Sequence, residues 1–314
     1  MKVLVTGGAG FIGSNLTNEL IKDHEVVVFD NFSTGKIDNL DSSNNLTVIE
    51  GDITDYPFMN KVLADKFDVI YHLAAIASVA ASVEDPMYCN EVNFKATLNL
   101  LEQIRQNGFE TKIVFASSAA VYGDNENLPL SESDAVRPLS PYAIDKYAAE
   151  QYVLNYAQLF NIDTCATRFF NVYGPKQDPK SPYSGVISIL IDATLDSNKE
   201  FSLYGDGSQT RDFVYIDDLV NALTILGDSK EISGKVFNVG TGNSISLTNL
   251  IKSIESVSNQ KLEINNQPAR NGDVKDSRAD INRISELGYT TNFSIKDGLL
   301  ELYKYEFSKL NPAN

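Results

Sequence analysis

The 314-residue sequence predicts an α/β protein in which a doubly wound parallel sheet is followed by a smaller, mixed α/β region. Two observations predict this class. Apolar runs of strand length alternate with helical patterns as far as about residue 170, which is typical of parallel sheets. After Gly174-Pro175 the elements become shorter and mixed. We therefore expect one domain from residues 1–172 plus about 211–240, and a second from about 173–210 and 241–314.

The first elements are a strand at residues 2–6, a glycine turn, a helix from Ser14 and a strand at residues 25–30. Gly7 permits the turn, Gly10 lets the main chain approach a pyrophosphate, and Gly13 lets the helix pack against the strand. Asp30 ends the second strand, seventeen residues after Gly13. A carboxylate there accepts hydrogen bonds from ribose hydroxyls and repels a 2′-phosphate. This Rossmann-type unit therefore predicts a site for NAD rather than NADP.

The next elements follow the same rhythm. Asp52 comes directly after the third strand, and we expect it to bind the adenine amine, to cap the helix that follows Thr54, or both. His72 ends the fourth strand and is interpreted as a core residue. Further strands are expected at 46–50, 67–72, 112–116, 163–169, 201–204, 212–216 and 237–240, and helices at about 86–106, 141–160, 185–196, 246–257 and 294–307 and from 217.

Composition limits the possible partners. The net charge of −16 argues against nucleic acid and against an anionic membrane surface. The sequence contains no apolar run of 18 residues, and its first residues enter a core strand directly, so we expect neither a membrane span nor a leader peptide. Cys89 and Cys165 are interpreted as reduced thiols of a cytoplasmic protein, and two histidines cannot form a metal cluster, so no metal site is expected.

One constellation carries chemistry. Tyr142 and Lys146 are four residues apart and share a helix face. A lysine ammonium close to a phenol is expected to lower the phenol's pKa, which makes tyrosine a usable general base. The same spacing recurs at Tyr305 and Lys309, so the pair alone is weak evidence. Ser118, at the carboxyl end of the fifth strand, distinguishes the first pair, because its hydroxyl can bind the substrate oxygen that Tyr142 would deprotonate.

These motifs together resemble the extended short-chain dehydrogenase/reductase superfamily, and within it the UDP-hexose 4-epimerases. The motifs are residues 6–13, 117–123, 142–146, 168–174 and 211–217, so the resemblance covers essentially the whole chain. It implies that Tyr142 takes the proton of the sugar 4-hydroxyl while C4 is oxidised by NAD. The 4-ketose then turns over and is reduced on its other face. It also implies permanently bound NAD, a UDP-sugar substrate and a homodimer formed through the helices near 86–106 and 141–160.

The resemblance also implies the roles of individual residues. The catalytic residues are Ser118, Tyr142 and Lys146. The residues expected to bind NAD are Gly7, Gly10, Phe11, Ile12, Gly13, Asp30, Asn31, Ser33, Gly35, Asp52, Ile53, Leu73, Ala74, Ala75, Asn93, Ser117, Tyr142, Lys146 and Phe169. The residues expected to bind substrate are Ser78, Val79, Ser118, Tyr142, Asn171, Val186, Leu203, Tyr204, Arg211, Arg270, Asp273 and Ser277.

The residues after Ser118 favour epimerisation. In similar 4,6-dehydratases an Asp-Glu pair follows the catalytic hydroxyl, whereas this chain has Ala119 and Ala120. Ser277 occupies a position that is bulky in relatives confined to UDP-glucose and UDP-galactose, so N-acetylated sugars are expected to fit. Residues 77–79 depart from the pattern of some relatives, which leaves open another nucleotide-sugar enzyme of the same scaffold, such as a UDP-glucuronate 4-epimerase or a reductase. The third alternative, a non-catalytic NAD-binding regulator, is disfavoured because the chain retains all three catalytic residues.

Overall fold

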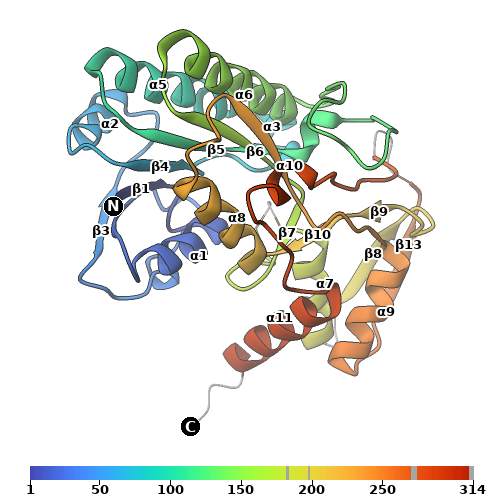
Figure 1. The fold of residues 1–314 in the computed structure, drawn as a ribbon. Helices are drawn as coiled ribbons and strands as arrows, with labels where there is room; N and C mark the ends of the chain where they lie inside the picture. Colours follow the sequence, from blue (N-terminus) through green and yellow to red (C-terminus); the bar gives the residue numbers. More distant parts are fainter. Residues whose placement is uncertain (182–183, 197–198, 270–273, 311–314) are drawn as a thin grey trace.

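The computed structural model describes residues 1–181, 184–196, 199–269 and 274–310, and its centre is a seven-stranded, entirely parallel sheet (Figure 1). The chain starts in the middle of the sheet and winds outward in both directions, which confirms the predicted fold class. In spatial order the strands are β11 (Lys235–Val239), β6 (Thr164–Phe169), β5 (Lys112–Ser118), β4 (Val69–His72), β1 (Lys2–Thr6), β2 (Glu25–Asp30) and β3 (Leu46–Glu50).

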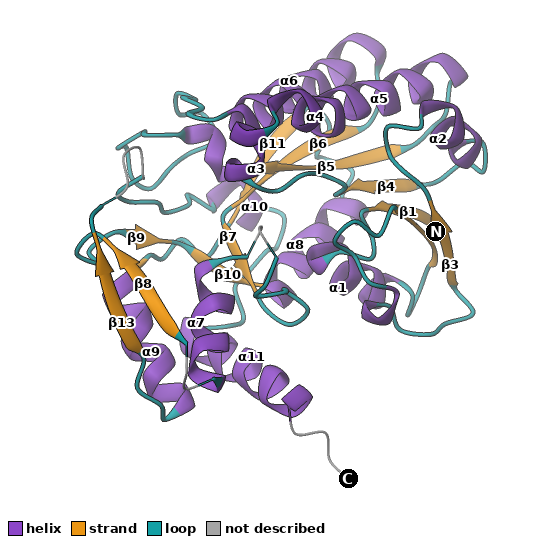
Figure 2. Cartoon of the chain, turned by 180° about the vertical axis from the view of Figure 1, so that it is seen from behind, coloured by secondary structure: helices purple, strands orange, loops and turns teal. Residues whose placement is uncertain are grey.

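Helices cover both faces of this sheet (Figures 1 and 2). The alternation along β1 assigns each face: Val3 and Val5 pack in the hydrophobic cluster that includes α1 and α8, and Leu4 packs in the cluster that includes α2, α5 and α6. The bounds are α1 (Phe11–Leu20) and α8 (Ile216–Asp228) on the first face, and α2 (Tyr56–Leu63), α5 (Ala96–Asn107) and α6 (Pro141–Phe160) on the second.

Helix α6 shows why the sequence forms its elements where it does. Ser140 caps the helix by accepting a hydrogen bond from the backbone N–H of Ala143 at 3.2 Å, and Pro141 occupies the first helical position. Asn161 ends the helix in the left-handed conformation, with φ of 55°. Tyr142 and Lys146, which the sequence predicts to be catalytic, therefore lie in the first two turns, next to the carboxyl ends of the strands.

The second region lies beside those carboxyl ends (Figure 2). Its described residues form three two-stranded sheets: β7 (Asn171–Tyr173) with β10 (Phe213–Tyr215), β8 (Glu200–Tyr204) with β13 (Glu263–Gln267), and β9 (Thr210–Arg211) with β12 (Ile245–Ser246). Its helices are α7 (Val186–Leu195), α9 (Leu247–Ser258), α10 (Asn282–Ser285) and α11 (Ile295–Leu310). The division into two domains stays a prediction. After the second region has begun, the chain does return to the large sheet with β11, which is the edge strand beside β6.

The structure corrects three local expectations. The helix expected from residue 86 to 106 is α4 (Pro86–Asn90), a π-helical turn (Glu91–Lys95) and α5. No helix was predicted between the fourth strand and residue 86, but the structure has α3 (Val79–Glu84) there, because the Ser78 hydroxyl caps that helix by accepting from the N–H of Ala81. Asp55, not Asp52, caps α2, since its carboxylate accepts the N–H of Phe58.

Two shorter elements complete the list: 3-10 turns at Ile37–Asn39 and Ala119–Tyr122. Within the described residues, no helix is both long enough and apolar enough to cross a bilayer.

Candidate active site

The glycine turn forms one wall of the site. Gly7 has φ of +70°, and a Cβ there would lie 2.8 Å from the backbone nitrogen of Ala74. A Cβ on Gly13 would lie 2.0 Å from the Gly7 carbonyl oxygen, so only glycine lets α1 approach the turn. A Cβ on Gly10 would meet that oxygen at 3.3 Å and nothing else within 4 Å. Gly10 also starts α1 without a side-chain cap, so the first N–H groups of the helix remain available to an anion.

Two carboxylates follow the next two strands. Asp30 is buried, and its oxygens accept the N–H groups of Ala9 at 2.9 Å and Phe32 at 2.8 Å. Asp52 accepts from Asn31 at 2.9 Å and from the N–H and hydroxyl of Thr54. Burial would raise the pKa of Asp52, but these hydrogen bonds outweigh it and lower the pKa. Both acids are therefore held as oriented acceptors at the carboxyl ends of β2 and β3.

Ser118, Tyr142 and Lys146 lie together at the opposite end of the site, beside the carboxyl end of β5. Ser118 ends β5, and its hydroxyl is hydrogen-bonded to the half-buried phenol of Tyr142. Lys146 is buried and donates from Nζ to the carbonyl oxygen of Ala116 at 2.8 Å. This arrangement joins the two hydroxyls that can share one substrate oxygen, with an ammonium one helical turn further along.

The pKa of Tyr142 does not behave as the sequence argument expected. The four-residue spacing from Lys146 predicts a lowered pKa for the phenol. Instead, burial raises the pKa of Tyr142 above its ordinary value, and the hydrogen bond with Ser118 lowers it only in part. Burial also lowers the pKa of Lys146, to about 8. In the chain alone, desolvation of the phenol therefore decides the direction of the shift, and the four-residue spacing does not reveal that contribution.

His72 is a core residue, as the sequence suggested. It is buried, its Nδ1 lies 2.8 Å from the Thr6 hydroxyl and its Nε2 3.0 Å from the Thr97 hydroxyl. Burial, with a smaller contribution from Lys146, lowers its pKa to about 3, so the ring stays neutral at neutral pH.

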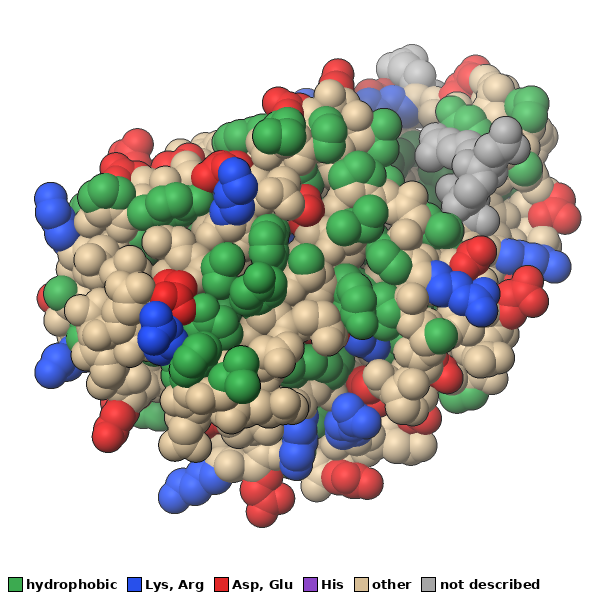
Figure 3. Space-filling model, turned by 90° about the horizontal axis from the view of Figure 1, so that it is seen from above, with side chains coloured by type: hydrophobic (Ala, Val, Ile, Leu, Met, Phe, Trp, Pro, Cys, Tyr) green, Lys and Arg blue, Asp and Glu red, His purple; other side chains and the backbone are tan. Residues whose placement is uncertain are grey.

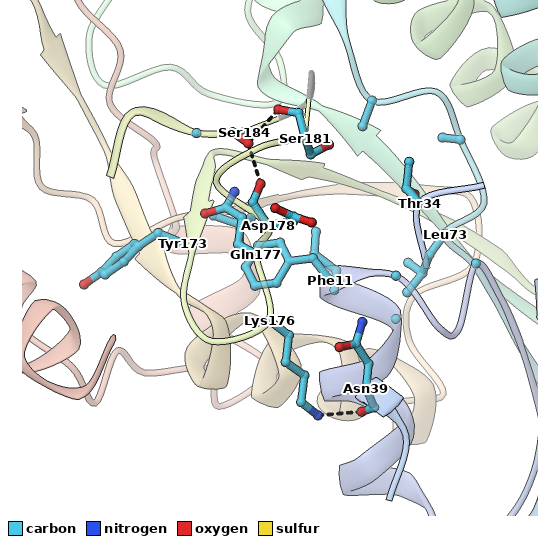
Figure 4. A pocket seen from close by; sticks show the side chains of 18 of the residues that line it. Phe11, Thr34, Asn39, Leu73, Tyr173, Lys176, Gln177, Asp178, Ser181 and Ser184 are labelled. Atoms are coloured by element: carbon cyan, nitrogen blue, oxygen red, sulfur yellow. Dashed lines mark hydrogen bonds between the residues drawn. The ribbon is translucent and has the colours of Figure 1, made fainter. Parts of the chain in front are cut away.

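A cavity of about 1330 Å³ connects these walls. Figure 4 shows Phe11 at the start of α1, Thr34 and Asn39 after β2, and Leu73 after β4 around the same space. The predicted residues that line it are Gly7, Gly10, Phe11, Ile12, Gly13, Asp30, Asn31, Ser33, Asp52, Ile53, Leu73, Ala74, Ala75, Ser117, Ser118, Tyr142, Lys146, Phe169, Asn171, Val186 and Arg211. The residues of the glycine turn, Asp30 and Asp52 therefore line the same cavity as Ser118, Tyr142 and Lys146.

Other predicted site residues do not line this cavity. Gly35 packs against Ala9, and Asn93 is buried and bonds both backbone groups of Ile76. Ser78 caps α3, whereas Val79 is 48% exposed. Leu203 is buried in the core, and Tyr204 and Ser277 lie elsewhere in the second region. Arg270 and Asp273 lie outside the described residues. The roles of these residues stay predictions.

Sequence reasoning missed the lysines and the acid that close one side of the cavity. Lys36 Nζ lies 2.8 Å from Asp178 Oδ2. Lys176 donates to the Asn39 carbonyl oxygen at 2.8 Å, as Figure 4 shows. The hydrogen bond and charge of Lys36 lower the pKa of Asp178. These residues follow β2 and β7, in loops at the carboxyl ends of strands, where ligands of open α/β sheets bind. Their position in loops after strands is the sequence feature that could have identified them as site residues.

Comparisons with known proteins agree with this geometry. A family model described as GDP-mannose 4,6 dehydratase matches residues 4–302. The UDP-glucose 4-epimerase of Mycolicibacterium smegmatis is 37% identical over 310 residues, covering 97% of this chain and 98% of that protein. The chain therefore belongs to the NAD-dependent epimerase/dehydratase family of extended short-chain dehydrogenases/reductases, and within it to the nucleotide-sugar 4-epimerases.

Two solved structures are similar over almost their full length. The UDP-N-acetylglucosamine 4-epimerase from Methanobrevibacter ruminantium M1, in complex with UDP-N-acetylmuramic acid, has a TM-score of 0.92 and 38% identity and covers 98% of each chain. The UDP-glucuronic acid 4-epimerase from Bacillus cereus, in complex with UDP-glucuronic acid and NAD, has a TM-score of 0.89 and 35% identity, covering 98% of this chain and 100% of that one. The resemblance inferred from the motifs is thus confirmed at the level of the family.

Proposed function

We propose that the protein is a UDP-hexose 4-epimerase that interconverts UDP-glucose with UDP-galactose and UDP-N-acetylglucosamine with UDP-N-acetylgalactosamine. The observation that carries this proposal is that Ser118, Tyr142 and Lys146 share one cavity with the glycine turn. The methyl side chains of Ala119 and Ala120 after Ser118 support epimerisation over elimination, since neither can carry a proton.

The residues present fit NAD. The space beside Gly10 admits a pyrophosphate at the start of α1, and the oriented carboxylate of Asp30 suits a ribose diol and disfavours a 2′-phosphate. NAD bound there supplies the reversible oxidation of the sugar carbon. A UDP-sugar epimerase of close similarity was solved with NAD, which supports the same cofactor here.

The chain's own residues handle the proton. Tyr142 takes the proton of the sugar 4-hydroxyl and later returns it. Burial disfavours the phenolate form in the chain alone, and Lys146 with the positive charge of bound nicotinamide would favour it. The Ser118 hydroxyl holds both the phenol and the substrate oxygen in place. Lys146, with a pKa of about 8, is mainly charged at pH 7 and stabilises negative charge that develops nearby. Arg211 and Asn171 line the cavity beyond these residues, where the diphosphate is expected.

The test is to incubate the purified protein, without added NAD, with UDP-glucose, UDP-N-acetylglucosamine and UDP-glucuronate separately. NMR should detect the C4 epimer of the first two. Tyr142→Phe should abolish turnover while NAD stays bound. Absence of product from every sugar, or full activity in Tyr142→Phe, would contradict the proposal.

Substrate size is proposed to depend on Ser277, whose small side chain leaves room for an N-acetyl group. Ser277→Tyr should stop turnover of UDP-N-acetylglucosamine and spare UDP-glucose. UDP-glucuronate remains the second candidate substrate, because a similarly folded relative binds it. Product from UDP-glucuronate alone would select that alternative.

We also propose that the protein is a cytoplasmic homodimer. Figure 3 shows hydrophobic side chains gathered on the face formed by α3 to α6, and the exposed large apolar side chains of these helices are Val79, Val83, Met87, Tyr88, Ile144, Tyr152, Leu159 and Phe160. A monomer rarely exposes so many large apolar side chains on one face. The two cysteines are free and buried, which suits a reducing compartment. Sedimentation analysis of Leu159→Glu should show monomers if this face pairs two copies.

A further inference from the structure

Behind the catalytic residues lies a buried ion pair that the proposed mechanism does not use. The Glu150 side chain is fully buried and that of Arg168 is 3% exposed. Arg168 donates to the carboxylate twice, from Nε to Oε2 at 3.0 Å and from Nη2 to Oε1 at 2.6 Å. Such a pair is a weak source of stability, because desolvating two charges opposes their attraction. Its position beside the active site indicates another role.

The same carboxylate accepts a third hydrogen bond, from a second partner. The Ser117 hydroxyl donates to Glu150 Oε2 at 2.7 Å. Ser117 and Arg168 are register partners on β5 and β6, so Glu150 joins two neighbouring strands at one level. The next residue on β5 is Ser118. The buried carboxylate is thus one residue away from the hydroxyl that holds the substrate oxygen in the proposed function.

Glu150 is also part of the catalytic helix. Tyr142, Lys146 and Glu150 follow one another at intervals of four residues and share one face of α6. Lys146 bonds the Ala116 carbonyl oxygen, and Glu150 bonds the Ser117 hydroxyl. Helix α6 is therefore attached to β5 at two consecutive residues, immediately before the strand reaches Ser118.

We propose that Glu150 is a positioning residue for the epimerisation: held by Arg168, its carboxylate keeps the end of β5 against α6 and thereby sets the separation of the Ser118 hydroxyl from the Tyr142 phenol. This role rests on the proposed function. Its physical basis is that a displacement of about 1 Å in a catalytic site can cost about a hundredfold in rate. The Ser117 hydroxyl is the link that transmits the position.

The test removes that link and leaves the ion pair intact. Ser117→Ala deletes only the hydroxyl. Thr167→Val is the matched control, because Thr167 is also fully buried and its hydroxyl donates from β6 to the Phe115 carbonyl oxygen on β5 at 2.9 Å. We expect Ser117→Ala, compared at saturating NAD because Ser117 also lines the cavity, to lower kcat about tenfold, with KM within about twofold of the unmodified protein. Thr167→Val should leave kcat within about twofold.

A second measurement does not need turnover. The ionisation of Tyr142 is followed as the ultraviolet difference between each protein and its Tyr142→Phe counterpart. The groups that act on this phenol are Ser118 from β5 and Cys89 from α4, and only Ser118 is positioned through Ser117. Ser117→Ala should therefore shift the ionisation of Tyr142 to higher pH, and Thr167→Val should not.

The two measurements separate the two proposals. If the unmodified protein epimerises no UDP-sugar, the proposed function fails, and the ionisation of Tyr142 still tests the positioning. If Ser117→Ala and Thr167→Val behave alike in both kcat and ionisation, Glu150 has no positioning role. Loss of bound NAD as the cause of the lower kcat in Ser117→Ala would equally overturn it.

Discussion

Gly10→Ala and Gly13→Ala should have different effects: the first should mainly weaken NAD binding, and the second should mainly lower the free energy of unfolding. The two glycines belong to one turn, but their surroundings differ. A methyl group on Gly13 would lie 2.0 Å from the Gly7 carbonyl oxygen, and backbone cannot move aside as a flexible side chain can. A methyl group on Gly10 would lie 3.3 Å from the same oxygen and otherwise extend into open space.

The magnitudes follow from these distances. Overpacking against backbone costs Gly13→Ala about 3 kcal/mol, and the better helix propensity of alanine returns about 1 kcal/mol, so unfolding becomes easier by about 2 kcal/mol. Gly10→Ala puts a poor cap at the start of α1 and costs about 0.5–1 kcal/mol. Its methyl group occupies the approach of the pyrophosphate, so NAD affinity should fall at least about tenfold.

The assay combines urea denaturation of the NAD-free proteins with calorimetric titration of NAD. Gly13→Ala should lose more unfolding free energy than Gly10→Ala. Gly10→Ala should lose at least about tenfold in NAD affinity although its unfolding free energy changes little. The reasoning would be refuted if Gly13→Ala were as stable as the unmodified protein, or if Gly10→Ala bound NAD with unchanged affinity.

Three further substitutions test other contacts, two in the site and one in the core. Ser118→Ala removes the hydrogen bond that lowers the pKa of Tyr142, so the acid limb of the kcat/KM profile should move to higher pH; an unmoved limb would show that Ser118 does not tune the base. Asp30→Asn should weaken NAD binding about tenfold and reduce the discrimination against NADP, as competitive titration with both nucleotides would reveal. Gly227→Ala places a methyl group 1.9 Å from the Tyr71 hydroxyl oxygen and should lower the unfolding free energy by about 1–3 kcal/mol, whereas adding Tyr71→Phe should recover most of that loss in urea denaturation.

Several parts of the site could be predicted because they depend on short stretches of sequence. The glycine spacing from Gly7 to Gly13 and the position of Asp30 are properties of one strand–turn–helix–strand unit. The spacing of Tyr142 and Lys146 places both on one helix face whatever surrounds the helix. These residues line one cavity in the structure, as the order of parallel strands required.

Other features depend on contacts that no local pattern contains. Lys36 and Asp178 form a pair across 142 residues of chain, and their loops meet only because β2 and β7 end at the same side of the molecule. The sign of the Tyr142 pKa shift also depends on burial, which the helical spacing does not reveal. Asp52 was one of two nearby acids that could cap α2, and only the backbone geometry selected Asp55.

By itself, the sequence determined the fold class and the Rossmann-type unit, because each follows from periodicity or spacing within a single element or between adjacent ones. Only the tertiary structure decided which side chains meet across elements. It brought Ser117, Glu150 and Arg168 together behind Ser118, and it buried Tyr142 and Lys146 enough to shift both pKa values. The physical reason is that desolvation and long-range hydrogen bonds exist only once distant segments have packed.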